Sequence, residues 1–156
     1  MEKSAILFVD NGQNRDKDYS IVINEDVLGI VNGYKTLNIY VIQRIDDNTN
    51  TVLKDENVSQ CPYVYSVSKD LKSAFTHLDG TSTKVLDLII KDEIKLLHVF
   101  GVNTENVVKN TVLEALNVGL KVNFIKNLSQ EKDRELAHQA IEEMRSAGAT
   151  ISIYPR

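Results

Sequence analysis

The sequence is poor in the residues that build disulfide-rich and membrane proteins. It has one cysteine, Cys61, two prolines and no tryptophan among 156 residues. A single cysteine excludes an intramolecular disulfide and a cysteine-rich metal site, and it indicates a reducing compartment. No apolar run approaches the roughly 18 residues of a membrane span, and the apolar pentad near the N-terminus is too short for a signal sequence. We therefore expect a cytoplasmic protein without a membrane partner.

Basic residues are also fewer than acidic ones. The chain has 18 Lys and Arg residues against 22 Asp and Glu residues, which gives a formal net charge of −4. Because binding to phosphates needs clustered Lys and Arg side chains, and none stand out in the sequence, we expect no nucleic-acid partner. The hydrophobic share of 42% is ordinary for a globular protein. The length fits one domain, residues 1–156.

The order of the apolar segments predicts an α/β fold. Residues 5–9 form a continuous apolar run, which is typical of a strand buried on both faces of a parallel sheet. Further strands are expected at residues 37–42, 63–67, 97–100, 121–125 and 150–153. Helical spacing of apolar residues predicts helices at 24–34, 85–90, 104–119 and 136–144, and residues 45–60 should form a loop or lid. This alternation predicts a three-layer, doubly wound, Rossmann-like sheet of six mainly parallel strands with helices on both faces.

Hydroxyl and glycine residues predict where three of these helices begin and end. Thr81 or Ser82 is expected to cap the helix at 85–90, and Thr104 to open the next one. Gly119 and Gly148 are expected to end the last two helices.

Three features fall at the carboxyl ends of expected strands, where ligands bind in such sheets. They are Asp10 after the first strand, Lys69 after the third, and the turn at residues 101–107 after the fourth. An acid, a base and a helix N-terminus would then share one edge of the sheet. A charged residue at a strand end is more often simply exposed to solvent, without a functional role. For each of these features taken alone, this alternative stays open.

Four segments resemble the isochorismatase-like superfamily, which includes cysteine hydrolases that cleave nicotinamide and N-carbamoylsarcosine. They are Ala-Ile-Leu-Phe-Val-Asp at 5–10, Lys-Asp-Leu-Lys-Ser-Ala-Phe at 69–75, Gly-Val-Asn-Thr-Glu-Asn-Val-Val at 101–108 with Thr111 and Ala115, and residues 138–151. The resemblance implies the isochorismatase-like fold over nearly the whole chain. It also implies Asp10 as general base, Lys69 as its charge-stabilising partner and position 107 as the place of the nucleophile.

The resemblance further implies contacts with a small-molecule ligand, and a cis peptide bond between Val102 and Asn103. The contact residues it implies are Gly101, Val102, Asn103, Thr104, Gln13 and Phe75. The family's Asp-x-Gln is lengthened here to Asp-Asn-Gly-Gln at residues 10–13.

Val107 breaks the catalytic pattern. In the family's chemistry a helix N-terminus lowers the pKa of a thiol, a carboxylate takes the proton, and backbone N–H groups receive the oxyanion. Valine offers neither a lone pair nor a proton, so amide hydrolysis through a thioester is excluded at this position. Cys61 is no substitute, because a strand separates it from Lys69 and, at about 3.3 Å per residue, it should lie about 20 Å away. Helix capping explains the hydroxyl of Thr104 more simply than nucleophilic chemistry does.

Metal ligands are missing from the sequence as well. The nicotinamidases of the family that bind zinc carry an Asp and two histidines after the second strand, whereas residues 44–48 contain no histidine. The three histidines, His77, His98 and His138, have no mutual ligand spacing. We expect no metal and no other cofactor.

Two functions remain open. The first is a non-catalytic relative, a pseudoenzyme that keeps the fold for binding or assembly, with Val107 partly filling the pocket. The second is cysteine-independent hydrolysis of a vinyl ether, as in isochorismatases, with Asp10 as the proton donor beside Lys69. An ion pair between these two residues could also serve structure alone. In each case the resemblance implies a homo-oligomer.

Overall fold

The computed structural model describes residues 3–10, 38–44, 63–67 and 70–153 of the chain. The helix expected at 24–34 and the lid expected at 45–60 lie outside the described residues, as do Gln13, Cys61 and Lys69.

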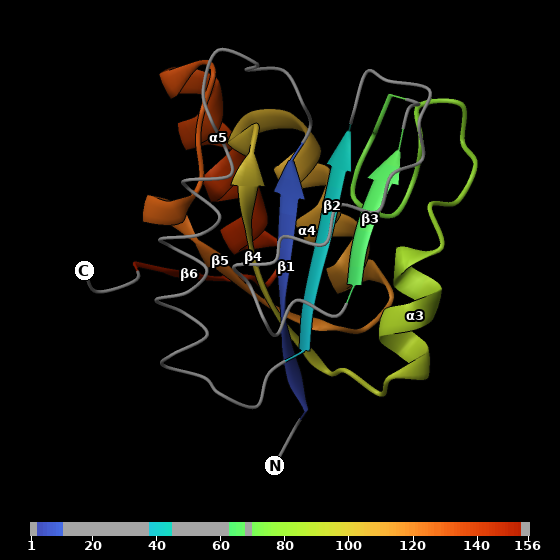
Figure 1. The fold of residues 1–156 in the computed structure, drawn as a ribbon. Coiled ribbons are helices and arrows are strands. Elements are labelled where there is room, and N and C mark those ends of the chain that lie inside the picture. The colour runs from blue at the N-terminus through green and yellow to red at the C-terminus, as the bar shows by residue number, and fades with distance from the viewer. Residues whose placement is uncertain (1–2, 11–37, 45–62, 68–69, 154–156) are drawn as a thin grey trace.

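Six strands form one parallel sheet (Figure 1). The strands are β1 (Ser4–Asp10), β2 (Asn38–Arg44), β3 (Tyr63–Val67), β4 (Leu96–Val102), β5 (Lys121–Ile125) and β6 (Thr150–Ser152). Their order across the sheet is β3-β2-β1-β4-β5-β6, and every neighbouring pair is parallel. Because the strands run outward from β1 in both directions, the predicted doubly wound α/β fold is confirmed. The bounds of β3 and β5 are those predicted.

Helices of the described part pack against one face of this sheet. They are α3 (Val85–Lys91), the π-helical turn η2 (Thr104–Val108), α4 (Lys109–Asn117) and α5 (Arg134–Ser146), while a 3-10 turn, η3 (Lys126–Leu128), directly follows β5. Alternate strand residues and the apolar sides of α3, α4 and α5 form one buried cluster, which includes Leu7, Tyr40, Val99, Val112, Phe124 and Met144. In Figure 1 this layer is visible as α4 behind the central strands. Among the described helices, none is long and apolar enough to cross a bilayer.

The centre of the sheet is buried on its other face too. Phe8 of β1 and Phe100 of β4 are paired in register, and their rings meet edge to face with centroids 5.2 Å apart. Both side chains are almost fully buried, as is the neighbouring Ile6. Burial on both faces explains why these strands are continuous apolar runs rather than alternating ones.

The prediction that Thr81 or Ser82 caps the helix at 85–90 is wrong. α3 begins at Val85, and its N-cap position is Lys84, which has a φ of 73° and makes no capping side-chain bond. Ser82 instead accepts a hydrogen bond from the backbone N–H of Lys84 at 2.9 Å, and Thr83 donates to the carbonyl of Ala74 at 2.6 Å. The hydroxyls in front of the helix are thus used to fold the preceding loop, so the helix starts later than its cap signals indicate.

The helix ends agree with the sequence. Gly119 and Gly148 follow α4 and α5 with φ values of +92° and +113°, a conformation that favours glycine. The apolar stripes are narrower than expected, because Ile90 of α3 and Leu136 of α5 are more than half exposed.

Candidate functional site

The carboxyl ends of β1 and β4 lie side by side. Asp10, the last residue of β1, is paired with Val102, the last residue of β4, and Val9 is paired with Gly101. A Cβ atom added to Gly101 would lie 2.0 Å from the carbonyl oxygen of Val9. Only glycine therefore allows β4 to lie this close to β1 near the carboxyl ends of the two strands.

Two hydrogen bonds of Gly101 tie the end of β4 to the loop that follows β5. Gly101 donates to the hydroxyl of Ser129 at 3.2 Å and accepts from the N–H of Gln130 at 2.8 Å. The next peptide bond, between Val102 and Asn103, is cis, which confirms the expectation from the resemblance. The residues implied as ligand contacts at 101–103 are thus held between β1 and the loop at 129–130.

The helical segment begins at Thr104, as expected, but the Thr104 hydroxyl does not cap it, which corrects the expected capping role. The N-cap of η2 is Asn103, whose carbonyl accepts from the N–H groups of Asn106 at 3.2 Å and Val108 at 3.1 Å. The hydroxyl and the N–H of Thr104 both donate to the carbonyl of Gln130, at 3.2 Å and 3.0 Å. The Thr104 hydroxyl bonds to this distant carbonyl because the turn is packed against the loop after β5. The local sequence does not reveal that contact.

Val107 is a core residue as well as a turn residue. Its side chain is 2% exposed and belongs to the same buried cluster as Val108, Val112 and Phe75. Its carbonyl accepts a hydrogen bond from the hydroxyl of Thr111 at 2.7 Å. The side chain at position 107 thus contributes packing, and Phe75, expected to contact a ligand, packs in the same cluster.

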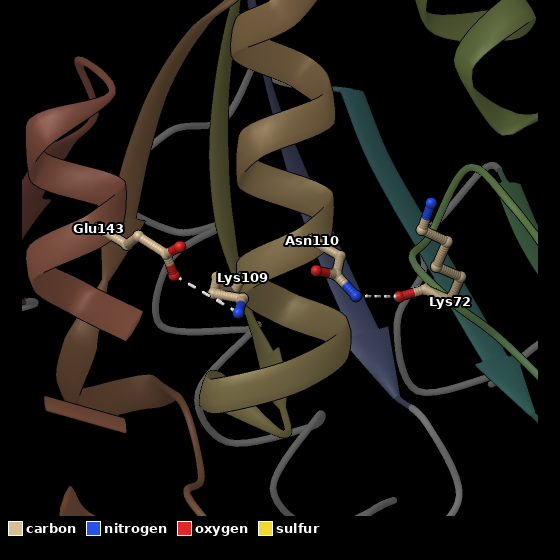
Figure 2. A network of polar contacts seen from close by, with 4 residues as sticks. All are labelled: Lys72, Lys109, Asn110 and Glu143. Carbon is tan, nitrogen blue, oxygen red and sulfur yellow. Dashed lines mark hydrogen bonds and ion pairs between the residues drawn. The ribbon is translucent and has the colours of Figure 1, made fainter. Parts of the chain in front are cut away.

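A short segment after β3, residues 72–75, docks onto α4. Ala74 donates its N–H to the hydroxyl of Thr111 at 2.8 Å, and Ser73 donates its hydroxyl to a carboxylate oxygen of Glu114. Figure 2 shows the side-chain amide of Asn110 donating to the carbonyl of Lys72 at 2.9 Å. The resemblance singled out Ser-Ala-Phe at 73–75 but gave no role to Thr111 or Glu114. Thr111 and Glu114 are polar residues three positions apart on an otherwise buried helix face, and this spacing is the sequence signal that could have identified them.

The acid and base expected at this edge are described only in part. The structure places the backbone of Asp10 at the end of β1 beside Val102, and Lys69 lies outside the described residues. Their meeting with position 107 stays a prediction from the resemblance.

A polar ladder crosses β4, β5 and β6. His98 Nδ1 lies 3.0 Å from Asn123 Nδ2, and the hydroxyl of Ser152 donates to Asn123 Oδ1 at 2.7 Å. Since the amide of Asn123 donates, Nδ1 of His98 accepts and the ring is neutral. Burial also lowers the pKa of His98 below its ordinary value, which agrees with this assignment. Within the described residues no three His, Cys, Asp or Glu side chains are grouped as metal ligands.

We expect stability to fall in mild acid because of His98. Its pKa is lowered on folding, so as pH drops through about 6.5 the unfolded chain takes up the proton first and the free energy of unfolding decreases, by at most about 1.4 kcal/mol per pH unit. The effect is complete once pH is below the folded pKa. Urea unfolding between pH 5 and 8 measures it, and His98→Gln should flatten the profile. An unchanged slope in that variant would assign the pH dependence to other groups.

A cavity of about 520 Å³ opens beyond the carboxyl ends of β4, β5 and β6. It is lined by Thr104, Lys126, Asn127, Ser129, Gln130, Glu131, Ile141 and Ile153. The predicted site residue that it includes is Thr104, whose hydroxyl is already bonded to Gln130.

Comparison with known proteins identifies a family. Residues 44–153, well over half of the chain, match the profile of the isochorismatase domain. A search of curated proteins finds no match.

Solved structures share the fold at low sequence identity. The nicotinamidase SaPncA from Staphylococcus aureus is 19% identical with a TM-score of 0.72, over 97% of this chain and 100% of that one. A nicotinamidase pyrazinamidase from Acinetobacter baumanii is 17% identical with a TM-score of 0.76, over 98% and 97% of the two chains. The YcaC gene product from Escherichia coli, described as an octameric hydrolase of unknown specificity, is 22% identical with a TM-score of 0.69, over 98% and 77%. At these identities the similarity establishes the fold alone.

Proposed function

Because the chain belongs to the isochorismatase domain family, we propose that it is a member that has lost the cysteine-hydrolase chemistry and uses the fold for binding or assembly. The observation that carries this proposal is the burial of Val107 in the apolar cluster between α4 and the sheet. The resemblance puts the nucleophile at this position. A packed valine there has no group that could attack a carbonyl and fills space that a substrate would need.

We expect the native protein to turn over no amide and no vinyl ether above the buffer rate. A screen of both substrate classes measures this, with Asp10→Asn and Lys69→Ala as matched variants. Turnover that both variants abolish would contradict the proposal, because it would assign chemistry to the acid and the base without a thiol. Turnover that survives in both variants would point to a contaminating enzyme.

The second candidate is cysteine-independent hydrolysis of a vinyl ether, as in isochorismatases. The register of β1 and β4 favours it, since it puts the backbone of Asp10 beside the turn that carries position 107. Asp10 would protonate the vinyl ether and Lys69 would stabilise charge, provided that burial keeps the Asp10 carboxyl protonated. Release of pyruvate from isochorismate is the specific signature of this reaction.

The remaining parts of the proposal concern organisation. One domain over residues 1–156 is supported by a single sheet that runs from β1 to β6, and a cytoplasmic location by the single cysteine. A homo-oligomer is supported by the octameric E. coli hydrolase, which shares the fold. Light scattering on the purified protein measures the oligomer directly, and a monomer across the accessible concentration range would count against assembly. The ligand of a binding function would be a small molecule held at the edge formed by Asp10, Lys69 and residues 101–107.

A further inference from the structure

One side of α4 carries polar residues that contact the segment at 72–75. Asn110 donates to the carbonyl of Lys72, and Glu114 accepts from Ser73 (Figure 2 shows the first of these bonds). Within the part of the chain that the structure describes, neither side chain is hydrogen-bonded to the turn that carries position 107. These contacts fix the segment to the helix but leave the turn to other interactions.

Thr111 is bonded to both places. Its hydroxyl donates to the carbonyl of Val107 at 2.7 Å and accepts from the N–H of Ala74 at 2.8 Å. One oxygen atom thus joins two residues that lie 33 positions apart in sequence. The side chain is fully buried, which excludes water as a substitute partner.

The direction of both bonds is fixed by chemistry. A carbonyl can only accept and an N–H can only donate, so the single proton of the Thr111 hydroxyl must point to Val107 and its lone pair to Ala74. A buried threonine that bonds only to the carbonyl four residues earlier is common in helices and has no further meaning. The second bond, to Ala74, is what makes Thr111 a link between segments.

We propose that Thr111 is a positioning residue that sets the spacing between position 107 and residues 73–75, two buried segments that the family resemblance places at the candidate site. The inference rests on the proposed function for the location of the site, but it does not depend on whether catalysis is lost. If residues 73–75 shift away from the turn, Phe75 leaves the cluster that it shares with Val107. The hydroxyl thus holds Phe75 and Val107, two residues that the resemblance assigns to the site, in one buried cluster.

Nuclear magnetic resonance on the full chain tests this link at both of its ends. The readouts are the exchange rate of the Ala74 amide hydrogen and the methyl resonances of Val107. Thr111→Val keeps the shape and removes both bonds, Thr111→Ser keeps the hydroxyl, and Asn110→Ala is the matched control that removes a bond from the same helix to the same segment.

In Thr111→Val we expect Ala74 exchange to accelerate at least tenfold relative to the other amides of the sheet, together with shifted Val107 methyl resonances. Thr111→Ser should restore the native values of both. Asn110→Ala should leave the Val107 methyl resonances in place, because Asn110 is bonded to Lys72. If the valine variant does not fold, Thr111→Ala is compared with Thr111→Ser in the same way.

Two results overturn the proposal. One is native Ala74 exchange and native Val107 resonances in the variants that lack the hydroxyl. The other is an equal shift of the Val107 resonances in Asn110→Ala, which would make the link a general property of the packed helix. Turnover in the substrate screen would refute the loss of catalysis and leave these measurements standing, so the two failures are distinguishable.

Discussion

Replacing Gly101 with alanine is expected to prevent the chain from folding stably. The new Cβ would lie 2.0 Å from the carbonyl oxygen of Val9, and 2.8 Å and 2.9 Å from two further backbone atoms of the same residue. No rotamer change relieves a clash between two backbones, so β1 and β4 would have to separate at the centre of the sheet. We expect a loss of more than about 4 kcal/mol in the free energy of unfolding, a large part of the stability of an ordinary domain. Urea unfolding followed by circular dichroism measures it.

Gly119→Ala and Gly148→Ala are the matched controls for this prediction. Both glycines have a positive φ, +92° and +113°, but no atom lies within 4 Å of an added Cβ. They report the backbone strain of a left-handed residue alone, which costs about 1–2 kcal/mol. A loss in Gly101→Ala no larger than in these controls would mean that β1 and β4 adapt easily, and the close approach would lose its structural importance.

Strands were the part of this fold that the sequence determined best. β3 and β5 were predicted to the residue, because their apolar runs are bounded by turn-forming residues and are short enough to exclude helices. The parallel, doubly wound architecture follows from the alternation of strands and helices, since parallel strands need crossover connections of one hand. These features are local or follow from connectivity, so the sequence alone predicts them. The order of the strands across the sheet comes from the structure.

Hydroxyl groups were the part that the sequence could not determine. Thr81, Ser82 and Thr104 precede helices, which is the pattern of a cap. In the structure Thr104 bonds to Gln130, 26 residues away, and caps nothing. The Thr111 hydroxyl also bonds to a residue that is distant in sequence, since its partner Ala74 lies 37 residues earlier in the chain. A hydroxyl can satisfy many acceptors, so only the tertiary fold decides which one it meets.

Replacing Val107 with cysteine is expected to create a reactive thiol in the folded protein. Position 107 lies near the start of a helical segment that runs from η2 into α4, and a helix N-terminus lowers the pKa of a thiol below about 8.5. Burial acts in the opposite direction, since Val107 is 2% exposed. We expect the helix terminus, together with Lys69, which the resemblance places nearby, to lower the thiol pKa by more than burial raises it. A thiol is smaller than the isopropyl group of valine, so the packing around position 107 is looser in the variant and burial has less effect. Alkylation by iodoacetamide as a function of pH, followed by intact mass, measures the thiol pKa.

The experiment needs two controls, because the chain has its own cysteine and because burial alone can silence a thiol. The substitution is made in a Cys61→Ser background, and Val108→Cys in that background places a thiol at a fully buried neighbour. Rapid alkylation at position 107 with an apparent pKa below about 8.5, and none at position 108, would separate a site position from a core position. A thiol at 107 that reacts only in urea would make it a core residue like its neighbour, and the location of the candidate site would then be wrong. Loss of catalysis could in that case no longer be argued from Val107, and Asp10 would have to be judged by the substrate screen alone.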